Sequence, residues 1–429
     1  MLTVRGADLV WTGSAEVPGG AVSCRDGLVV ADPVPGRVLD ASGCVVTPGL
    51  VNAHHHLLQS AFRTLPGTRG VPMREWLPAM AAAYAAVGID AESAHAAASV
   101  GLAEALLCGV TTVADHQLNW PPGDGVAVAS AVARAAGELG ARLVFVRGSA
   151  RDDPEQAAAS AEAVVGALAG TDVQVAVGPA GVHSDAPETF ALLGEVAARH
   201  GLRRRTQANE QVDVEIAAAR YGRRPLDLLD EWGWLAPDVT LAHLCGITEA
   251  ELTRVADAGV SATHAPGCDL PMGWGVAPAA ALADAGVAVG LGTSGGGSND
   301  AGHLLADARL AMQVAPLVGR PVAAREVLTW ATAGSAAGLG RTTPGAFPML
   351  GRLDPGFAAD LVCWDVTGVA DAGVADPLAG LLWAAPGRRP RHVVVGGRVV
   401  VEDYVLVTRP EPEIVFALGR LLHHRRERR

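Results

Sequence analysis

The sequence predicts a (β/α)8 barrel of the TIM type, together with a small β-sandwich built from both ends of the chain. Eight short apolar runs of strand character alternate with longer Ala- and Leu-rich segments of helical spacing across the middle of the chain. Polar residues gather where those runs end, as expected at the catalytic face of a barrel. A doubly wound parallel sheet would explain the alternation, but it would not explain polar residues at eight strand ends.

The two ends of the chain share a pattern that differs from the middle. Residues 1–48 and 346–406 contain short strand-like runs separated by Gly and Pro turns, so we expect them to form the two parts of the β-sandwich. The barrel is expected to occupy residues 49–345. Residues 407–429 combine a short helical pattern, EIVFALGRLL, with a basic tail, HHRRERR, which we expect to be solvated.

The eight barrel strands are expected in chain order, with helical segments between them. They are VVTPGLVNA before His54, VTTVADH ending at His116, RLVFVRG ending at Gly148, VQVAVGPAG ending at Gly181, RRTQANE ending at Glu210, VTLAHLCG around His243, VSATHAPG around His264 and VAVGLGTS ending at Ser294. The helix after the sixth strand has a recognisable start, because Thr248 followed by Glu251 fits a capping box. Parallel strands place all eight carboxyl ends at one rim of the barrel.

Composition excludes several kinds of chemistry. The 429-residue chain has no lysine, since all 33 cationic residues are arginine, so Schiff-base lysines, P-loop lysines and carbamylated-lysine metal bridges are ruled out. Its formal net charge of −12 disfavours nucleic-acid and anionic-membrane partners. Six scattered cysteines argue against a disulfide framework, and no run reaches the ~18 apolar residues of a membrane helix. We therefore expect a cytoplasmic protein without a membrane partner.

Histidines are concentrated at the predicted strand ends, where seven of the 13 lie. Because side chains alternate along a strand, His54 and His56 point to one side and His55 points to the other. With His243 as a third imidazole, this H-x-H pair could bind one Zn or Fe ion. The other histidines near the first, second and fourth strand ends are expected to satisfy buried backbone groups: His55, His116 and His183.

Five strand-end motifs are similar to those of a known family. The chain resembles the amidohydrolase superfamily in VTPGLVNAHHHLLQSAFR, TQANEQ, LAHLCGI, ATHAPGCDLPMGWGVAP and GLGTSGGGSND. The resemblance is to the aminohydrolase and chlorohydrolase branch, to which 8-oxoguanine deaminase and the triazine hydrolases belong, and it runs nearly end to end. It implies one Zn or Fe held by H-x-H, a fifth-strand His, a sixth-strand His and an eighth-strand Asp. It also implies a proton-shuttling Glu and a seventh-strand His that contacts the substrate.

Most of these positions are occupied by the residue that the resemblance requires. They are His54, His56, Glu210, His243 and His264. Two positions depart, because Gln207 stands where the fifth-strand His belongs and Ser294 where the eighth-strand Asp belongs. A carboxylate on the metal offsets its charge and accepts a proton from the attacking water, and serine does neither. Zn also prefers imidazole to a glutamine carbonyl. The resemblance therefore implies Zn or Fe, while the departures imply a weak, vestigial site or no metal.

Three functions remain open for such a site. In the first, which we favour, the protein is a hydrolase that deaminates a purine-, pterin- or triazine-like ring, with Gln207 as a weak metal ligand and Glu210 or Asp300 moving protons. In the second, no metal is bound, and Glu210 acts with a histidine in non-standard hydrolysis, tautomerisation or elimination. In the third, catalysis has been lost and the barrel binds a ligand.

The expected partner is a small heterocyclic substrate. Gln59 and Trp76 follow the first strand, where related enzymes close over their ligand, and are candidate substrate-binding residues. Further candidates lie at later strand ends: His183, Gln207 and Ser294. Members of the branch are commonly homodimers, so a homodimer is one assembly that the resemblance allows.

Overall fold

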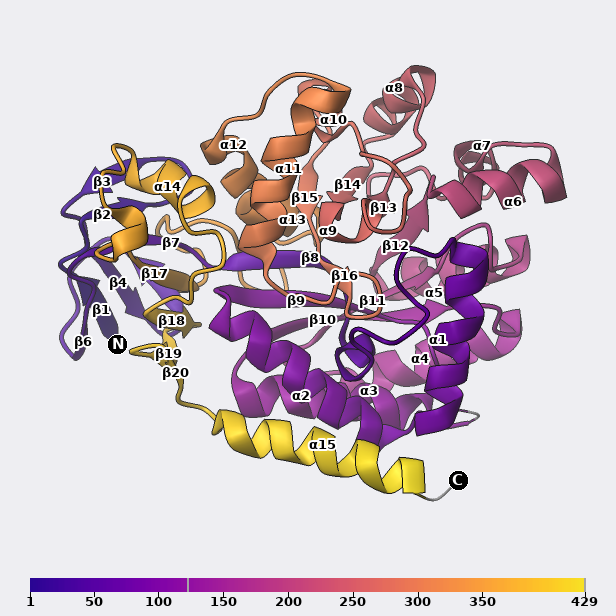
Figure 1. Cartoon of the computed structure of the whole chain (residues 1–429), viewed down its shortest axis with the longest axis horizontal. Coiled ribbons are helices and arrows are strands. Elements are labelled where there is room, and N and C mark those ends of the chain that lie inside the picture. The colour runs from indigo at the N-terminus through magenta and orange to yellow at the C-terminus, as the bar shows by residue number, and fades with distance from the viewer. Residues whose placement is uncertain (122, 428–429) are drawn as a thin grey trace.

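A closed parallel barrel forms the centre of the molecule (Figure 1). The computed structural model describes residues 1–121 and 123–427. The nine strands of this sheet have the order β15-β14-β13-β12-β11-β10-β9-β8-β16. They are β8 (Leu50–His56), β9 (Val110–Gln117), β10 (Arg142–Ser149), β11 (Gln174–Pro179), β12 (Arg203–Ala208), β13 (Val239–His243), β14 (Ser261–His264), β15 (Val289–Leu291) and β16 (Ser294–Gly295). Because β15 pairs with β14 and β16 pairs with β8, the eighth strand is split and closes the barrel, which confirms the predicted fold.

Helices connect the strands and cover the outside of the barrel. They are η1 (Leu57–Ala61), α1 (Met73–Val87), α2 (Ala91–Leu107), α3 (Gly125–Leu139), α4 (Pro154–Leu168), α5 (Pro187–His200), α6 (Gln211–Tyr221), α7 (Pro225–Glu231), α8 (Glu249–Asp257), α9 (Pro266–Asp269), α10 (Ala279–Asp284), α11 (Leu304–Val318), α12 (Ala324–Thr329), η2 (Trp330–Gly334) and α13 (Ser335–Gly338). The predicted capping box is present at α8, because Thr248 N donates to Glu251 Oε2 at 2.8 Å and the Thr248 hydroxyl accepts from Glu251 N. Asp90 and Ser93 cap α2 in the same way.

Both ends of the chain contribute to two further sheets, which lie beside the barrel (Figure 1). The four-stranded sheet contains β5 (Leu28–Val30), β4 (Val22–Arg25), β1 (Leu2–Arg5) and β6 (Arg37–Asp40), in that order. The seven-stranded sheet contains β20 (Val405–Leu406), β19 (Arg398–Glu402), β18 (His392–Val395), β17 (Leu361–Asp365), β7 (Cys44–Pro48), β2 (Leu9–Trp11) and β3 (Glu16–Pro18). The short segments η3 (Val369–Asp371) and α14 (Pro377–Trp383) follow β17. Val4, Leu39 and Val394 belong to one buried cluster that joins the two sheets.

The run VVTPGLVNA, which the sequence predicts as one strand, forms two strands in the structure. Its first part belongs to β7, which pairs with β17 and β2, and its second part belongs to β8 of the barrel. Gly49 separates them, and a side chain there would not fit, because a Cβ would lie 2.2 Å from Thr111 Oγ1. The apolar run is therefore continuous in sequence but is shared between two sheets.

The C-terminal helix α15 (Glu411–Glu427) is longer than the sequence predicts and packs along α2 (Figure 1). Arg425 donates to the carbonyl oxygens of Val87 and Gly88 at 3.0 and 2.8 Å, and it pairs with Asp90 at 2.7 Å. The expectation of a solvated basic tail is therefore wrong for Arg425, because its guanidinium satisfies carbonyl groups at the end of α1. Arg428 and Arg429 lie outside the described residues.

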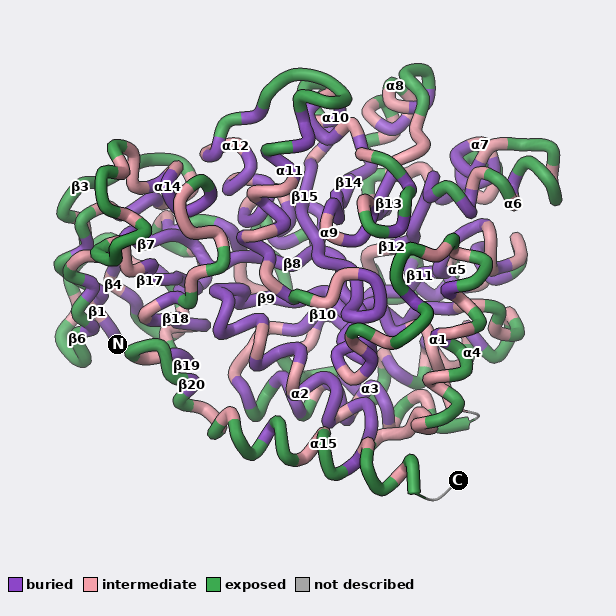
Figure 2. Tube along the Cα trace, in the orientation of Figure 1, coloured by how far each residue is buried: buried purple, intermediate pink, exposed green. Residues whose placement is uncertain are grey.

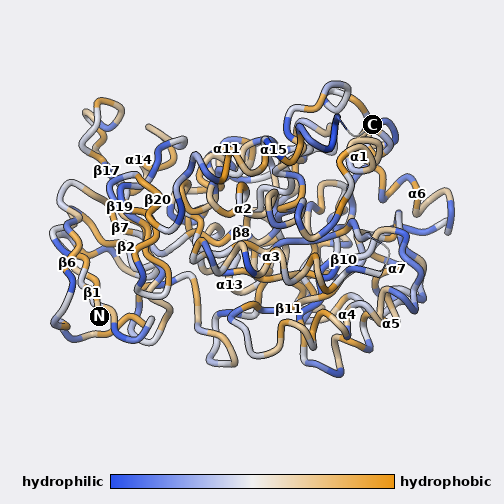
Figure 3. Tube along the Cα trace, turned by 90° about the horizontal axis from the view of Figure 1, so that it is seen from below, coloured by the Kyte–Doolittle hydropathy of each residue, from blue (hydrophilic) through white to orange (hydrophobic). Residues whose placement is uncertain are grey.

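Burial follows this layered arrangement. The barrel strands are mostly buried, whereas much of α8 and α15 is exposed (Figure 2). Hydrophilic residues gather on the outer loops beside α6 and α7 (Figure 3). Among the described residues, no helix combines the length and the apolar character that crossing a bilayer requires.

Candidate active site

A cavity of about 650 Å³ lies at the carboxyl ends of the barrel strands and is bordered by helix α1. Apolar side chains that line it include Trp76, Leu77, Met80, Tyr84, Met272 and Trp274. Polar side chains that line it include His56, Gln59, His183, Gln207, Ser294 and Ser298. The cavity thus brings together all five side chains that the sequence analysis assigns to substrate binding. Its size and mixed lining suit one small ligand with several polar atoms.

Gln59 on η1 and Trp76 on α1 connect these helices to the loop after the eighth strand. Gly297 N donates to Gln59 Oε1 at 3.0 Å, and Trp76 Nε1 donates to Gly297 O at 3.0 Å. The indole nitrogen of Trp76 is therefore already paired, which leaves its ring as the part that can contact a ligand. The amide group of Gln59 also hydrogen-bonds Tyr84, whose side chain lines the same cavity.

The H-x-H histidines lie close together at the end of β8. The ring centroids of His54 and His56 are 4.9 Å apart, whereas His55 is directed elsewhere and bonds Thr293 Oγ1 at 2.9 Å. His56 Nδ1 donates to the backbone oxygen of His116 at 2.7 Å, while His54 Nε2 is buried without a hydrogen-bond partner. Burial lowers the pKa of His56 to about 4 and that of His54 well below its usual range. Both rings are therefore neutral at physiological pH.

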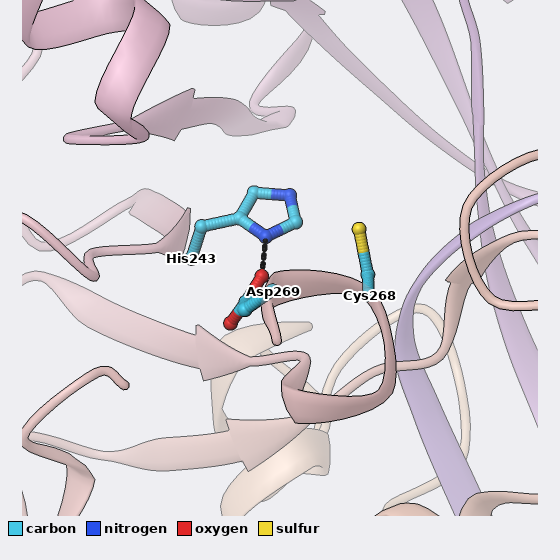
Figure 4. A group of neighbouring side chains, drawn as sticks. All are labelled: His243, Cys268 and Asp269. Carbon is cyan, nitrogen blue, oxygen red and sulfur yellow. Dashed lines mark hydrogen bonds and ion pairs between the residues drawn. The ribbon is translucent and has the colours of Figure 1, made fainter. Parts of the chain in front are cut away.

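His243 lies at the centre of a buried polar cluster. Its Nδ1 donates to Asp269 Oδ1 at 2.6 Å (Figure 4), and its Nε2 lies 3.1 Å from Gln207 Oε1. Burial opposes a charge on this ring, but Asp269 and Glu210 outweigh burial, so the pKa of His243 is raised. The same pairing lowers the pKa of Asp269 to about 2, again against the effect of burial. His243 and Asp269 therefore form a buried ion pair.

The carboxamide of Gln207 is oriented by the neighbouring strand end. Its Nε2 donates to Ala180 O at 3.1 Å, which turns Oε1 toward His243. Because amide and carboxylate oxygens only accept hydrogen bonds, both ring nitrogens of His243 must donate. In this arrangement Asp269 engages Nδ1 of His243 and Gln207 engages Nε2, as expected for an imidazolium.

Glu210 immediately precedes α6 and is 1% exposed. Both carboxyl oxygens are buried without a hydrogen-bond partner, and Oε1 lies 3.6 Å from His243 Nε2. Burial raises the pKa of Glu210. Asp213 shapes the preceding turn, since it accepts from Asn209 N at 2.9 Å and from both His183 N and Nδ1 at 3.2 Å. The Glu210 carboxyl group is therefore buried beside His243 without a hydrogen bond, next to the cavity but not among the residues that line it.

Two other carboxylates differ from what the sequence suggests. Asp300, expected as a candidate proton carrier, accepts from Thr64 N and pairs with Arg69, so both of its oxygens are engaged on the loop after η1. Asp269 was not recognised in the sequence, yet it contacts His243, and its Oδ2 lies 3.6 Å from His264 Nδ1. Its position five residues after His264 in HAPGCD is the only signal in the sequence that could have identified it.

The ligand group that the structure brings together differs from the Zn or Fe set that the motifs imply. Among the described residues, one group of three ligand atoms lies within 4.8 Å, from His243, Cys268 and Asp269 (Figure 4). Two ligands about 2.0–2.1 Å from a tetrahedral Zn²⁺ lie about 3.3 Å apart. The 2.6 Å contact between His243 and Asp269 is therefore a hydrogen bond and not one edge of a metal site. Burial also raises the pKa of the Cys268 thiol.

Comparison with known proteins places the chain in a family. A model of the Amidohydrolase family matches residues 45–400. The chain is 35% identical to an 8-oxoguanine deaminase from Pseudomonas aeruginosa, over 85% of this chain and 84% of the relative. It is 30% identical to an isoxanthopterin deaminase from an unknown prokaryotic organism, over 89% of this chain and 86% of the relative. Its structure matches atrazine chlorohydrolase TrzN from Arthrobacter aurescens TC1, complexed with zinc, with a TM-score of 0.91 and 33% identity over 98% of this chain and 100% of the other. The chain therefore belongs to the amidohydrolase family.

Proposed function

We propose that this protein hydrolyses a C–N bond of a small nitrogen-rich heterocycle, deaminating a purine-, pterin- or triazine-like ring. The relatives support the reaction class, because two of them are named as deaminases of 8-oxoguanine and isoxanthopterin. The observation that carries the proposal is Glu210, a buried carboxyl group with two unpaired oxygens beside the charged ring of His243. An unpaired buried carboxyl is costly, and such groups are concentrated at catalytic sites.

Glu210 can move every proton that the reaction requires. Its carboxyl group first donates a proton to the ring nitrogen next to the reacting carbon. The resulting carboxylate accepts one proton from water as the water oxygen bonds to that carbon. It then transfers this proton to the exocyclic nitrogen, and ammonia leaves as the C–N bond breaks. Finally it takes the proton of the new C–OH group, which leaves a ring carbonyl and regenerates the acid. The balance is one heterocyclic amine plus water giving one lactam plus ammonia.

The neighbouring residues would bind and orient the ring. Trp76 and Trp274 provide flat apolar contact area, while Gln59, His183 and Ser294 provide hydrogen-bonding groups on the cavity wall. His264 and His243 would complete the catalytic group through their shared contact with Asp269. The positive charge on His243 would stabilise the Glu210 carboxylate that forms when the carboxyl group gives up its proton.

The proposal is tested by ammonia release from a panel of aminopurines, aminopterins and aminotriazines. Glu210→Gln is expected to lower kcat about 10²–10⁴-fold, because the amide cannot transfer protons. Glu215→Gln on the exposed side of α6 is the matched control and should retain wild-type turnover. Binding of a panel member in a thermal-shift assay without any ammonia release would refute catalysis and support a ligand-binding homologue.

We further propose that the protein works in the cytoplasm and does not bind nucleic acid. All six cysteines are free thiols, and the net charge is −12. A homodimer, common in this branch, is part of the proposal and is tested by light scattering.

A further inference from the structure

A buried arginine lies inside the barrel beneath the candidate active site. Arg205 is on β12, two residues before Gln207, so both side chains project from the same face of the strand. It is 2% exposed, and its guanidinium donates to the backbone oxygen of Ala53 on β8. Strands β12 and β8 are four positions apart in the order of the sheet, so this contact crosses the interior of the barrel. Ala53 directly precedes His54, which places the cation next to the H-x-H pair.

The charge on Arg205 is not offset by an anion. Its Nη1 is buried without a hydrogen bond, and no carboxylate among the described residues forms an ion pair with it. Burial lowers the pKa of Arg205 to about 9, so the group remains a cation at neutral pH. By contrast, the buried Arg147 on β10 pairs with Asp152 at 2.8 Å. A buried, unpaired charge is expensive and is rarely found without a functional reason.

We propose that Arg205 supplies, as a fixed charge, part of the positive potential that a metal ion provides in zinc-containing relatives, and that it excludes a divalent cation from His54 and His56. The exclusion of a divalent cation (the metal-exclusion part) does not depend on the proposed function. The contribution of Arg205 to catalysis (the catalytic part) rests on the proposed function. Because the guanidinium contacts the backbone of the residue before His54, an ion bound to the H-x-H pair would lie near a like charge, and like charges repel strongly in a buried site.

The changes at the other ligand positions agree with this arrangement. Gln207 does not act as a ligand but accepts from the charged ring of His243, and Ser294 carries no negative charge to offset an ion. The site therefore has no anionic ligand at the eighth strand and contains a buried cation. Each change lowers the affinity for Zn²⁺, and they act in the same direction.

The test measures Zn²⁺ binding by equilibrium dialysis with metal analysis, which does not depend on turnover. Wild type is expected to bind far less than one equivalent, and Gln207→His with Ser294→Asp should bind weakly. Adding Arg205→Met to that pair should tighten Zn²⁺ binding at least about 100-fold, whereas adding Arg205→Lys should not, because lysine keeps the charge. Arg147→Met in the same background is the control for loss of a buried arginine.

Folding is checked by circular dichroism, and Arg205→Gln replaces Arg205→Met if that variant is unfolded. Stoichiometric Zn²⁺ in wild type, with turnover lost to a chelator, would overturn the proposal. The proposal would also be overturned if Arg205→Met, Arg205→Gln and Arg205→Lys gave the same Zn²⁺ affinity in that background. If wild type neither binds Zn²⁺ nor turns over any member of the panel, only the proposed function is refuted. The catalytic part predicts that Arg205→Lys retains more of the wild-type kcat than Arg205→Met, with similar KM values.

Discussion

The ion pair between His243 and Asp269 can be tested by removing its negative charge. Asp269→Asn preserves shape and still offers an oxygen to His243 Nδ1, but it removes the carboxylate in direct contact with the imidazolium. If the ring becomes neutral, one nitrogen loses its proton, and the lone pair of Nε2 then faces Gln207 Oε1. Gln207 cannot turn to donate to it without giving up its own bond to Ala180 O. The substitution therefore disturbs the network whichever form His243 adopts.

The expected loss can be estimated from the burial of the pair. Both side chains are fully buried, and breaking one partner of a buried pair costs about 3–5 kcal/mol. An unfolding entropy of about 2.1 cal/mol/K per residue, taken over this chain, converts that loss into a fall in Tm of about 3–6 °C. The raised pKa of His243 gives stability that is present below its ordinary pKa of 6.5 and is lost as pH rises through the folded value. The lowered pKa of Asp269 gives stability that is lost only as pH falls from 3.8 toward about 2.

Differential scanning calorimetry between pH 5 and pH 9 measures this effect. The difference in Tm between wild type and Asp269→Asn should be largest near pH 5–6 and should shrink at alkaline pH. The double variant His243→Gln with Asp269→Asn is the control, and it should recover part of the loss because neither charge is then left unpaired. A difference in Tm that is independent of pH, together with additive effects in the double variant, would refute the ion pair.

Three further predictions concern other parts of the fold. Arg425→Met should increase hydrogen exchange at the turn between α1 and α2, whereas Arg426→Met should not, because only Arg425 binds that turn. Burial raises the pKa of Asp307 to about 7, so the free energy of unfolding of wild type should fall by up to about 4 kcal/mol as pH rises from about 4 to 7. Asp307→Asn should not show this pH dependence in denaturation experiments. Gly178→Ala should unfold the barrel or lower Tm sharply, because its Cβ would lie 1.5 Å from Arg205 O, while Gly166→Ala on α4 meets open space and should raise Tm slightly.

The barrel could be predicted because each strand is a local apolar run that ends in polar residues. The strand boundaries around Gly49 could not, since the apolar run there is continuous and only the contact with Thr111 shows where one sheet ends and the next begins. The H-x-H pair and Glu210 were likewise visible as local motifs. The roles of Gln207 and Asp269 were not, because both depend on where His243 lies, and His243 ends β13, whereas Gln207 is on β12 and Asp269 ends α9.

Arg205 is another residue whose position the sequence does not reveal. In RRRTQA it is one of three consecutive arginines, and nothing in the sequence distinguishes it from its neighbours. In the structure Arg204 pairs with Asp238 at the surface, whereas Arg205 crosses the barrel to Ala53. Alternation along a strand indicates that the two side chains point in opposite directions, but it does not indicate which of them enters the barrel.

The charges of the site explain why restoring one ligand would not restore a metal centre. Gln207→His alone would remove the oxygen that accepts from His243 Nε2 and would leave Arg205 beside the H-x-H pair. Ser294→Asp alone would add a carboxylate but would leave Gln207 at the fifth strand and the charge of Arg205 in place. Neither single reversion therefore supplies the complete ligand set. Only the combined change, with the charge on Arg205 removed as well, gives His54 and His56 an environment in which a divalent ion is favoured.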